Sequence, residues 1–329
     1  MNLHSDVAPS EDLPHEPQAV PHWSESYAFW AWDNRNNLTV YGHFQRHPEK
    51  PIIWRGYCTV MQGDQIYAIH TYGRQRSPSG PGFESVHVTI EDPHHLWRFR
   101  AEGAGQQRSC ASLFKSAIND GPAVPLRVDV LLTCRTSVWA LKHGTPGTEA
   151  IMPAHYEQTG EVIGFVEIGD KRYEVNCLGA NDHSHGPRNT QTLYNGSGFF
   201  NAAFPSGRSL TAIQMSPTAH TGYINFGDGK IRPVTRVVMP KSGWEPGETG
   251  SFTAETNDRS VEVSYEITPR RVALTMVPPN YEHIGLIDGP ATRLMYCDFT
   301  CNVQWEGEHG SGSWEPCWNN DAQRAPSGI

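Results

Sequence analysis

Hydrophobic and polar residues alternate along most of this chain, which is the pattern of β-strands that bury one face. Within 261–267 the apolar side chains Val261, Val263, Tyr265 and Ile267 alternate with polar ones, and the same period of two recurs in 85–91. Strands are also expected over 57–61 and 126–134. Clusters of Gly, Pro, Asn, Asp and Ser separate these segments. Only 109–118 has the spacing of an amphipathic helix. We therefore predict an all-β fold of antiparallel strands with little helix.

The last long strand, expected over 293–305, has two different faces. One face is apolar or sulfur-bearing (Met295, Cys297, Phe299, Cys301, Val303 and Trp305). The other face is polar (Tyr296, Asp298, Thr300, Asn302 and Gln304). Such a polar row fits either the lining of a cavity inside a barrel or a sheet surface that faces solvent.

The chain is long enough for two domains. It has 329 residues, with 31 Gly and 25 Pro, a composition typical of many short strands joined by turns. The Gly-, Pro- and Thr-rich segment 142–148 is the best candidate for a domain boundary. We expect a first β-domain over 21–148 and a second over 149–329. Residues 1–20, rich in Asp, Glu, Pro and Ser, are expected to form a disordered tail.

Charge and cysteine content narrow the function classes. A formal net charge of -9 without a Lys- or Arg-rich run argues against a nucleic-acid partner. No apolar stretch is long enough to span a membrane, and the first 20 residues lack the pattern of a secretory signal. Seven cysteines without a C-x-x-C pair favour reduced thiols and a cytoplasmic location. Cys297 and Cys301 are interpreted as small buried hydrophobes rather than as a metal pair.

Ionisable residues are concentrated in 180–190. Asp182, His183, His185 and Arg188 bring a carboxylate, two groups that titrate near neutral pH and a fixed cation within seven residues. On a strand, His183 and His185 would project to one side and Asp182 and Ser184 to the other. These four ionisable residues are the candidate catalytic groups. The alternative is a polar strand end with solvated histidines.

A second set of residues is expected to bind substrate. The segment 23–32 is dense in aromatic side chains, which must be buried on at least one face. Other candidates come from the beginning of the second half and from a later loop. The set is Trp23, Glu25, Tyr27, Trp30, Tyr156, Glu157 and His220.

Three motifs give the chain a resemblance to a known family. They are the run 153–158 (Pro-Ala-His-Tyr-Glu-Gln) followed by Gly160 and Gly164, the run 182–188 (Asp-His-Ser-His-Gly-Pro-Arg), and Trp23, Glu25, Tyr27 and Phe29 at alternate positions. Together they resemble the tandem lipocalin-like family of carotenoid 1,2-hydratase, AttH-like proteins, tocopherol cyclase and fungal decalin-forming Diels-Alderases. The resemblance implies two consecutive lipocalin-like barrels, an apolar ligand cavity, no metal and no organic cofactor.

The resemblance also suggests roles for two residues. In the carotenoid hydratase motif an Asp-His pair precedes a Trp, and the His takes part in protonating or hydrating an alkene. Here Asp182 and His183 match that pair, whereas His185 occupies the Trp position and no matching Tyr-x-Asp pair follows.

These observations predict an acid/base enzyme that needs no cofactor and acts on an apolar terpenoid, steroid or polyketide-like molecule. The reaction would be hydration or dehydration, double-bond isomerisation or cyclisation, with His183 as the proton donor or acceptor. One alternative is a non-catalytic binding protein for an apolar small molecule. The other is a metal enzyme in which His183 and His185 share an ion with Asp182, His155 or His220. Oligomeric state is left open.

Overall fold

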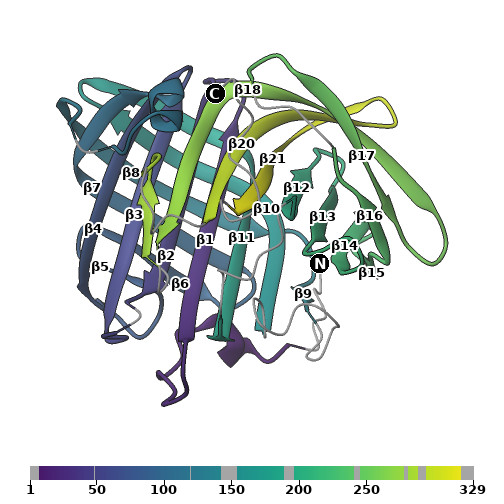
Figure 1. The fold of residues 1–329 in the computed structure, drawn as a ribbon, viewed down its shortest axis with the longest axis horizontal. Coiled ribbons are helices and arrows are strands. Elements are labelled where there is room, and N and C mark those ends of the chain that lie inside the picture. The colour runs from purple at the N-terminus through teal and green to yellow at the C-terminus, as the bar shows by residue number, and fades with distance from the viewer. Residues whose placement is uncertain are drawn as a thin grey trace.

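The computed structural model describes residues 7–47, 49–118, 120–141, 154–188, 196–240, 245–277, 281–287 and 294–319. Nearly all of this part of the chain is antiparallel β-structure arranged in two sheets, which confirms the all-β prediction. Figure 1 shows the first sheet in purple to teal as a barrel and the second in green to yellow beside it.

The first sheet has eleven strands. They are β1 (Trp23–Asp33), β2 (Leu38–Arg46), β3 (Ile53–Gln62), β4 (Gln65–Arg74), β5 (Gly82–Phe83), β6 (Val86–Asp92), β7 (Leu96–Ser109), β8 (Ala123–Cys134), β9 (Trp139–Ala140), β10 (Ala154–Ile168) and β11 (Lys171–Pro187). The hydrogen-bonded order is β4-β3-β2-β1-β11-β10-β8-β7, and pairing of β7 with β4 closes it into a ring. Closure leaves no free edge among these strands.

The strand pairing moves the domain boundary that we expected at 142–148. That segment lies outside the described residues, but β10 and β11, which follow it, pair with β8 and β1 of the first sheet. The barrel needs both strands, because β1 and β8 would otherwise keep unpaired backbone groups on one side. The change from the first sheet to the second therefore comes after Pro187 rather than near residue 148.

The second sheet has ten strands. They are β12 (Gly198–Ala203), β13 (Arg208–Gln214), β14 (His220–Phe226), β15 (Ile231–Pro233), β16 (Arg236–Val238), β17 (Thr249–Glu255), β18 (Ser260–Val277), β19 (Tyr281–Ile284), β20 (Leu294–Trp305) and β21 (Glu308–Asn319). Their order is β15-β14-β13-β12-β21-β20-β18-β17-β16, with β19 on β18. A register shift between Ile267 and Arg271 divides β18 into two parts.

Strand β1 is buried along its whole length because it faces the core on both sides. Tyr27 and Phe29 point into the barrel, where they pack with aromatic and β-branched side chains. Ala28 and Trp30 point the other way and join the core between the two sheets. The aromatic density of 23–32 thus reflects a strand with two buried faces.

The two sheets are held together by buried polar contacts as well as by apolar packing. Trp30 Nε1 donates to Asp298 Oδ2 at 2.6 Å, and the hydroxyls of Thr39 and Thr300 lie 3.0 Å apart. The polar row expected on 293–305 is therefore divided: Asp298 and Thr300 are buried against the first sheet, whereas Asn302 is exposed. Both readings of that row apply, each to a different part of the strand.

The N-terminal segment 7–20 is not the disordered tail that its composition suggested. It includes a short 3-10 helix, η1 (Pro9–Asp12), and Asp12 is buried. Asp12 Oδ2 accepts hydrogen bonds from His94 N at 2.7 Å and from Trp97 Nε1 at 2.9 Å. A carboxylate with buried donors fixes a segment that has few apolar side chains of its own.

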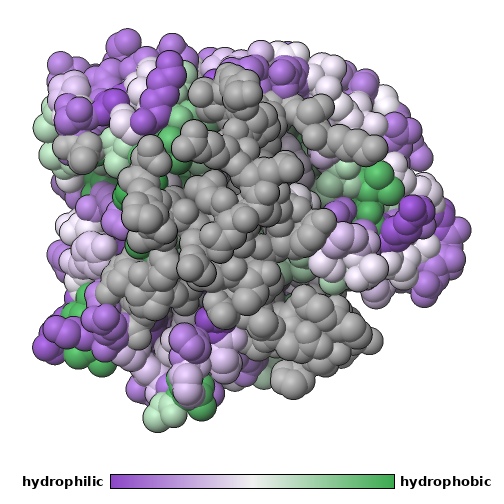
Figure 2. Space-filling view, viewed as in Figure 1, coloured by the Kyte–Doolittle hydropathy of each residue, from purple (hydrophilic) through white to green (hydrophobic). Residues whose placement is uncertain are grey.

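The expected helix over 109–118 is only a 3-10 helix, η2 (Cys110–Phe114), whose Leu113 and Phe114 are buried. All seven cysteines are free thiols. No helix in the described ranges is long and apolar enough to cross a membrane. Where the surface in Figure 2 is coloured, hydrophilic residues predominate.

The Asp12 contacts can be tested by mutation. Replacement of Asp12 with Ala leaves two buried donors without an acceptor, each of which costs about 1–3 kcal/mol. We expect Asp12→Ala to lower the free energy of unfolding by about 2–4 kcal/mol in urea denaturation. Glu16→Ala, at an exposed position of the same segment, is the control and should change stability by less than about 0.5 kcal/mol. Equal effects of the two substitutions would contradict the proposed role of Asp12.

Candidate active site

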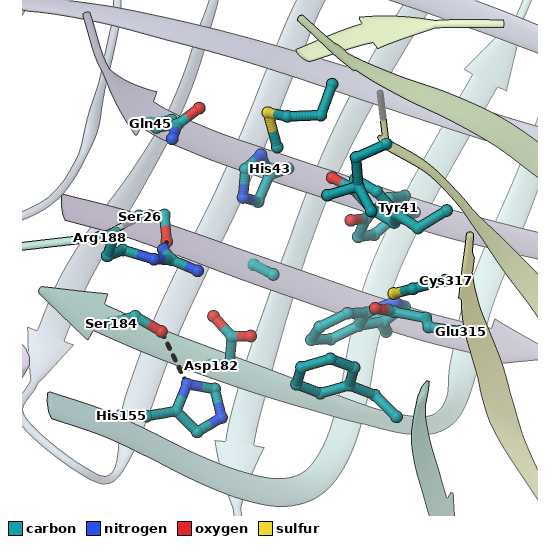
Figure 3. Close-up of a pocket in the computed structure, with 16 residues that line it drawn as sticks. Ser26, Tyr41, His43, Gln45, His155, Asp182, Ser184, Arg188, Glu315 and Cys317 are labelled. Atoms are coloured by element: carbon teal, nitrogen blue, oxygen red, sulfur yellow. Dashed lines mark hydrogen bonds between the residues drawn. The ribbon is translucent and has the colours of Figure 1, made fainter. Parts of the chain in front are cut away.

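A cavity of about 100 Å³ lies between the two sheets. Its walls come from β1, β2, β10 and β11 on one side and from β12, β18, β20 and β21 on the other (Figure 3). The residues that line it are Ser26, Ala28, Trp30, Tyr41, His43, Gln45, His155, Asp182, Ser184, Arg188, Phe199, Met276, Leu294, Tyr296, Glu315 and Cys317. The inside of the first barrel is filled by packed aromatic and aliphatic side chains.

The alternation of β11 separates the predicted catalytic residues into two groups. Asp182, Ser184 and Arg188 line the cavity between the sheets. His183 and His185 project from the opposite face, where His183 stacks on Tyr27 with ring centroids 3.9 Å apart. The structure therefore brings the two histidines together and the aspartate and arginine together, but not all four.

His183 and His185 belong to a cluster with the N-terminal segment. Glu25 Oε1 lies 2.9 Å from His15 Nδ1 and 3.2 Å from His183 Nε2, and Glu25 Oε2 accepts from Arg46 Nε at 2.8 Å. His185 Nε2 lies 3.3 Å from Glu11 Oε2. The Glu25 side chain has no exposed surface. The cluster ties residues 11–15 to β1, β2 and β11.

Charge pairing decides the protonation of this cluster. Burial alone would raise the pKa of Glu25, but the hydrogen bonds from His15 and His183 and the charge of Arg46 outweigh it and lower that pKa. Burial and the neighbouring charges of His15 and His183 lower the pKa of His185 to about 4. At neutral pH Glu25 is therefore an ion paired with Arg46, and His185 is neutral.

Three groups of side chains in the described residues have atoms close enough together to hold a metal ion. They are Glu11, His15 and His185; His15, Glu25 and His183; and His155, Glu157 and Asp182. None of these groups contains both His183 and His185, and none contains His220. The metal alternative, in which His183 and His185 share an ion, does not match this arrangement.

Arg188 is the cation of the cavity. Its Nη1 donates to Ser26 Oγ at 2.6 Å (Figure 3). Burial lowers the pKa of Arg188, and the charge of Asp182 opposes that shift. Arg188 and Asp182 thus influence each other electrostatically on the cavity face, rather than beside the histidines.

A buried carboxyl pair, Asp298 and Glu315, was missed by the sequence analysis. The two side chains are hydrogen-bonded to each other, and Glu315 lines the cavity. Burial raises the pKa of both groups; for Glu315 the charge of Asp298 adds to the increase, whereas the hydrogen bond from Trp30 moderates it for Asp298. Two carboxyls that share a site without a cation retain a proton. The available signal was Glu315 itself, an acid directly between Trp314 and Pro316.

His43 enters the cavity with a charged network behind it. Its Nδ1 lies 2.7 Å from Glu282 Oε2, and Arg55 Nη2 donates to the same oxygen at 2.9 Å. Burial would raise the pKa of Glu282, but His43 and Arg55 outweigh it and lower that pKa to about 2. Sequence reasoning missed this network because Glu282 lies 227 residues from Arg55 along the chain.

The expected substrate-binding residues are distributed over several places. Trp30 lines the cavity. Trp23, Glu25 and Tyr27 surround the histidine cluster, and Tyr156 OH donates to Glu11 Oε2 at 2.8 Å. Glu157 is buried beneath the cavity wall beside His155. His220 lies on β14, where its Nδ1 accepts from Val237 N at 3.1 Å and its Nε2 lies 3.1 Å from Pro217 O.

Comparison with protein-family models assigns the chain to a family. Residues 8–320 match the family described as a domain of unknown function, DUF7064, and the chain belongs to that family. A search of curated protein sequences finds no match.

Solved structures with similar folds agree with the resemblance drawn from the motifs. An AttH-like protein (NE1406) from Nitrosomonas europaea has a TM-score of 0.55 at 12% identity, over 95% of this chain and 99% of its own. CghA with Sch210972 has a TM-score of 0.53 at 12% identity, over 97% of each chain. Kievitone hydratase from Nectria haematococca has a TM-score of 0.51 at 9% identity, over 95% of this chain and 93% of its own. At these identities the similarity establishes the fold, and the tandem lipocalin-like prediction is confirmed.

The Glu25 cluster makes a prediction about acid stability. Because the pKa of Glu25 in the folded protein lies below its ordinary 4.5, its stabilisation is complete above about pH 4.5 and is lost as the pH falls through the folded value. Glu25→Gln should cost about 3–5 kcal/mol at pH 7, since Arg46 stays buried without its partner. When the pH is lowered below 4.5, the free energy of unfolding of the variant should fall less than that of the wild type. Exposed Glu262→Gln serves as the control in urea titrations at each pH, and parallel pH profiles for the wild type and Glu25→Gln would contradict the assignment.

Proposed function

We propose that this protein is an acid/base enzyme that needs no cofactor and transfers a proton to an alkene or enone of an apolar small molecule bound between the two sheets. The reaction is hydration or dehydration, isomerisation or cyclisation, which makes it a lyase or an isomerase. The substrate is terpenoid, steroid or polyketide-like.

The carboxyl pair of Asp298 and Glu315 carries this proposal. A carboxylic acid that keeps its proton at neutral pH is a proton donor, and its position in the wall of a cavity lined by Trp30, Phe199 and Leu294 puts the donor beside apolar substrate atoms. The low dielectric of such a site strengthens its electrostatic interactions. Glu315 is the proposed donor of the proton that the pair holds, and Asp298 shares that proton with Glu315 before the transfer.

The other wall supplies the complementary groups. Asp182 can accept a proton, and Arg188 and His43 can hold a substrate oxygen. The face of Trp30 can stabilise a developing carbocation. In this scheme His183 and His185, which were expected to transfer the proton, act indirectly: their contacts with Glu25 and Glu11 hold β11 so that Asp182 and Arg188 face the cavity.

The names of the structural relatives support this chemistry. One is a hydratase, and another has been crystallised with the small molecule Sch210972. Hydration of a substrate requires a proton donor and a second group that positions water, and Glu315 and Asp182 could serve in these two roles.

Replacement of the donor tests the proposal. The protein is incubated in D₂O with a panel of terpenoid, steroid and polyketide alkenes and enones, and deuterium bound to carbon is measured by mass spectrometry. Incorporation reports protonation whether hydration, isomerisation or cyclisation follows. We expect Glu315→Gln to lower its rate by about 10²-fold or more, because the amide cannot donate a proton of comparable acidity.

A second measurement does not depend on knowing the substrate. Infrared spectroscopy at neutral pH should detect the carbonyl stretch of a protonated carboxylic acid that is lost in Glu315→Gln. Glu262→Gln, an exposed position on β18, should keep both this band and the deuterium incorporation. A fully active, folded Glu315→Gln protein would refute the assignment of the donor.

A further inference from the structure

A serine, a histidine and a glutamate are aligned along the cavity wall formed by β10 and β11. Ser184 Oγ lies 2.7 Å from His155 Nδ1, and His155 Nε2 lies 2.6 Å from Glu157 Oε1. Figure 3 shows the first of these bonds, with both side chains directed toward the cavity. All three residues are buried.

Strand geometry explains the alignment. His155 is the register partner of Ser184 across the β10–β11 pair, and Glu157 lies two residues further along β10 on the same face. The acid/base reaction proposed above uses none of these three side chains.

The hydrogen-bond pattern determines what the imidazole can do. An ionised Glu157 can only accept, so the proton of His155 lies on Nε2 and its Nδ1 is left to accept the hydroxyl proton of Ser184. A hydroxyl beside a base that is itself oriented by a carboxylate is the arrangement that activates a serine nucleophile. The nitrogens are used in the reverse order of the serine proteases, which changes the orientation of the ring but not its chemistry.

We propose that Ser184 is an activated nucleophile, with His155 as its general base and Glu157 as the orienting carboxylate, and that the cavity hydrolyses a small carboxylic ester with an apolar group. Phe199, one of the side chains that the facing sheet contributes to the cavity, would contact that apolar group.

The proposed hydrolysis has two stages, acylation of Ser184 and release of the acyl group by water. Ser184 Oγ bonds to the ester carbonyl carbon while its proton moves to His155 Nδ1. The bond to the leaving oxygen then breaks, and that oxygen takes the proton from His155 and departs as an alcohol. Water repeats the sequence on the acyl-serine and releases the carboxylic acid.

Arg188 is placed to hold the negative oxygen of the tetrahedral intermediate. Its Nη1 donates to Ser26 Oγ, and Ser26 is the register partner of Ser184 on β1. The guanidinium is therefore beside the nucleophile. Because the guanidinium is buried, its electrostatic interaction with that oxygen would be stronger than in water.

The ionisation of Glu157 sets how the reactivity of Ser184 depends on pH. Burial raises its pKa even though His155 and Thr211 oppose the shift. The charged and titratable groups around it are His155, Asp182, Tyr223 and Glu315. Because only the ionised Glu157 leaves His155 Nδ1 free to act as a base, the reactivity of Ser184 should rise as the pH rises through the pKa of Glu157.

The first experiment uses the unaltered chain. The protein is treated with a small alkyl fluorophosphonate, and the product is analysed by intact mass and peptide mapping. We expect one label per chain, on Ser184, and slow release of p-nitrophenol from p-nitrophenyl acetate. Failure to label Ser184, or labelling of a different serine instead, would overturn the proposal.

Variants test the roles of the partners. His155→Gln keeps a hydrogen bond toward Glu157 but removes the base, and should slow labelling of Ser184 by about 10²–10⁴-fold. Glu157→Gln should slow labelling at neutral pH and abolish its rise with pH, which loss of a purely structural contact would not do. Ser313→Ala, the control, removes a different fully buried serine, and Ser184 of this variant should be labelled at the wild-type rate. Unchanged labelling in His155→Gln would overturn the proposal.

Discussion

The antiparallel pair of β1 and β11 is the constraint on which the rest of the structure depends, because both of its faces are buried. One face, with Tyr27 and His183, closes the core of the first barrel, and the other, with Trp30 and Asp182, forms the wall of the cavity between the sheets. A shift of one residue in this pairing would exchange the two sets of side chains. Glu25 on β1 contacts His183 on β11, so this contact lies across the pairing that places Asp182 at the cavity.

Buried carboxyl groups in this protein take opposite protonation states because their neighbours differ. Glu25 and Glu282 each lie against an arginine and at least one histidine, which keep them ionised in spite of burial. Asp298 and Glu315 have one another and an indole N–H, so burial prevails and a proton is retained. The first pair of sites stabilises the fold, and the second has the property that proton transfer requires.

The cavity takes its walls from both sheets. Its lining comes from strands between residues 26 and 317, with polar and charged side chains mainly from the first sheet and apolar ones and Glu315 from the second. In the proposed reaction the two sheets therefore have different roles, and the proposed chemistry depends on the contact between them.

The sequence by itself determined the all-β class, the alternation that puts Asp182 and His183 on opposite faces, and the resemblance to tandem lipocalin-like proteins, because these depend on local periodicity and short motifs. It did not determine the closure of the barrel by β10 and β11, the order of residues 7–20 or the pair of Asp298 with Glu315. Closure of the barrel pairs β1 with β11, and Asp12 contacts His94 and Trp97, so both features depend on partners distant in the chain. Asp298 and Glu315 lie on the neighbouring strands β20 and β21, but only the packing of this part of the second sheet against the first buries them. The tertiary structure decides these contacts, because local periodicity does not say which faces meet.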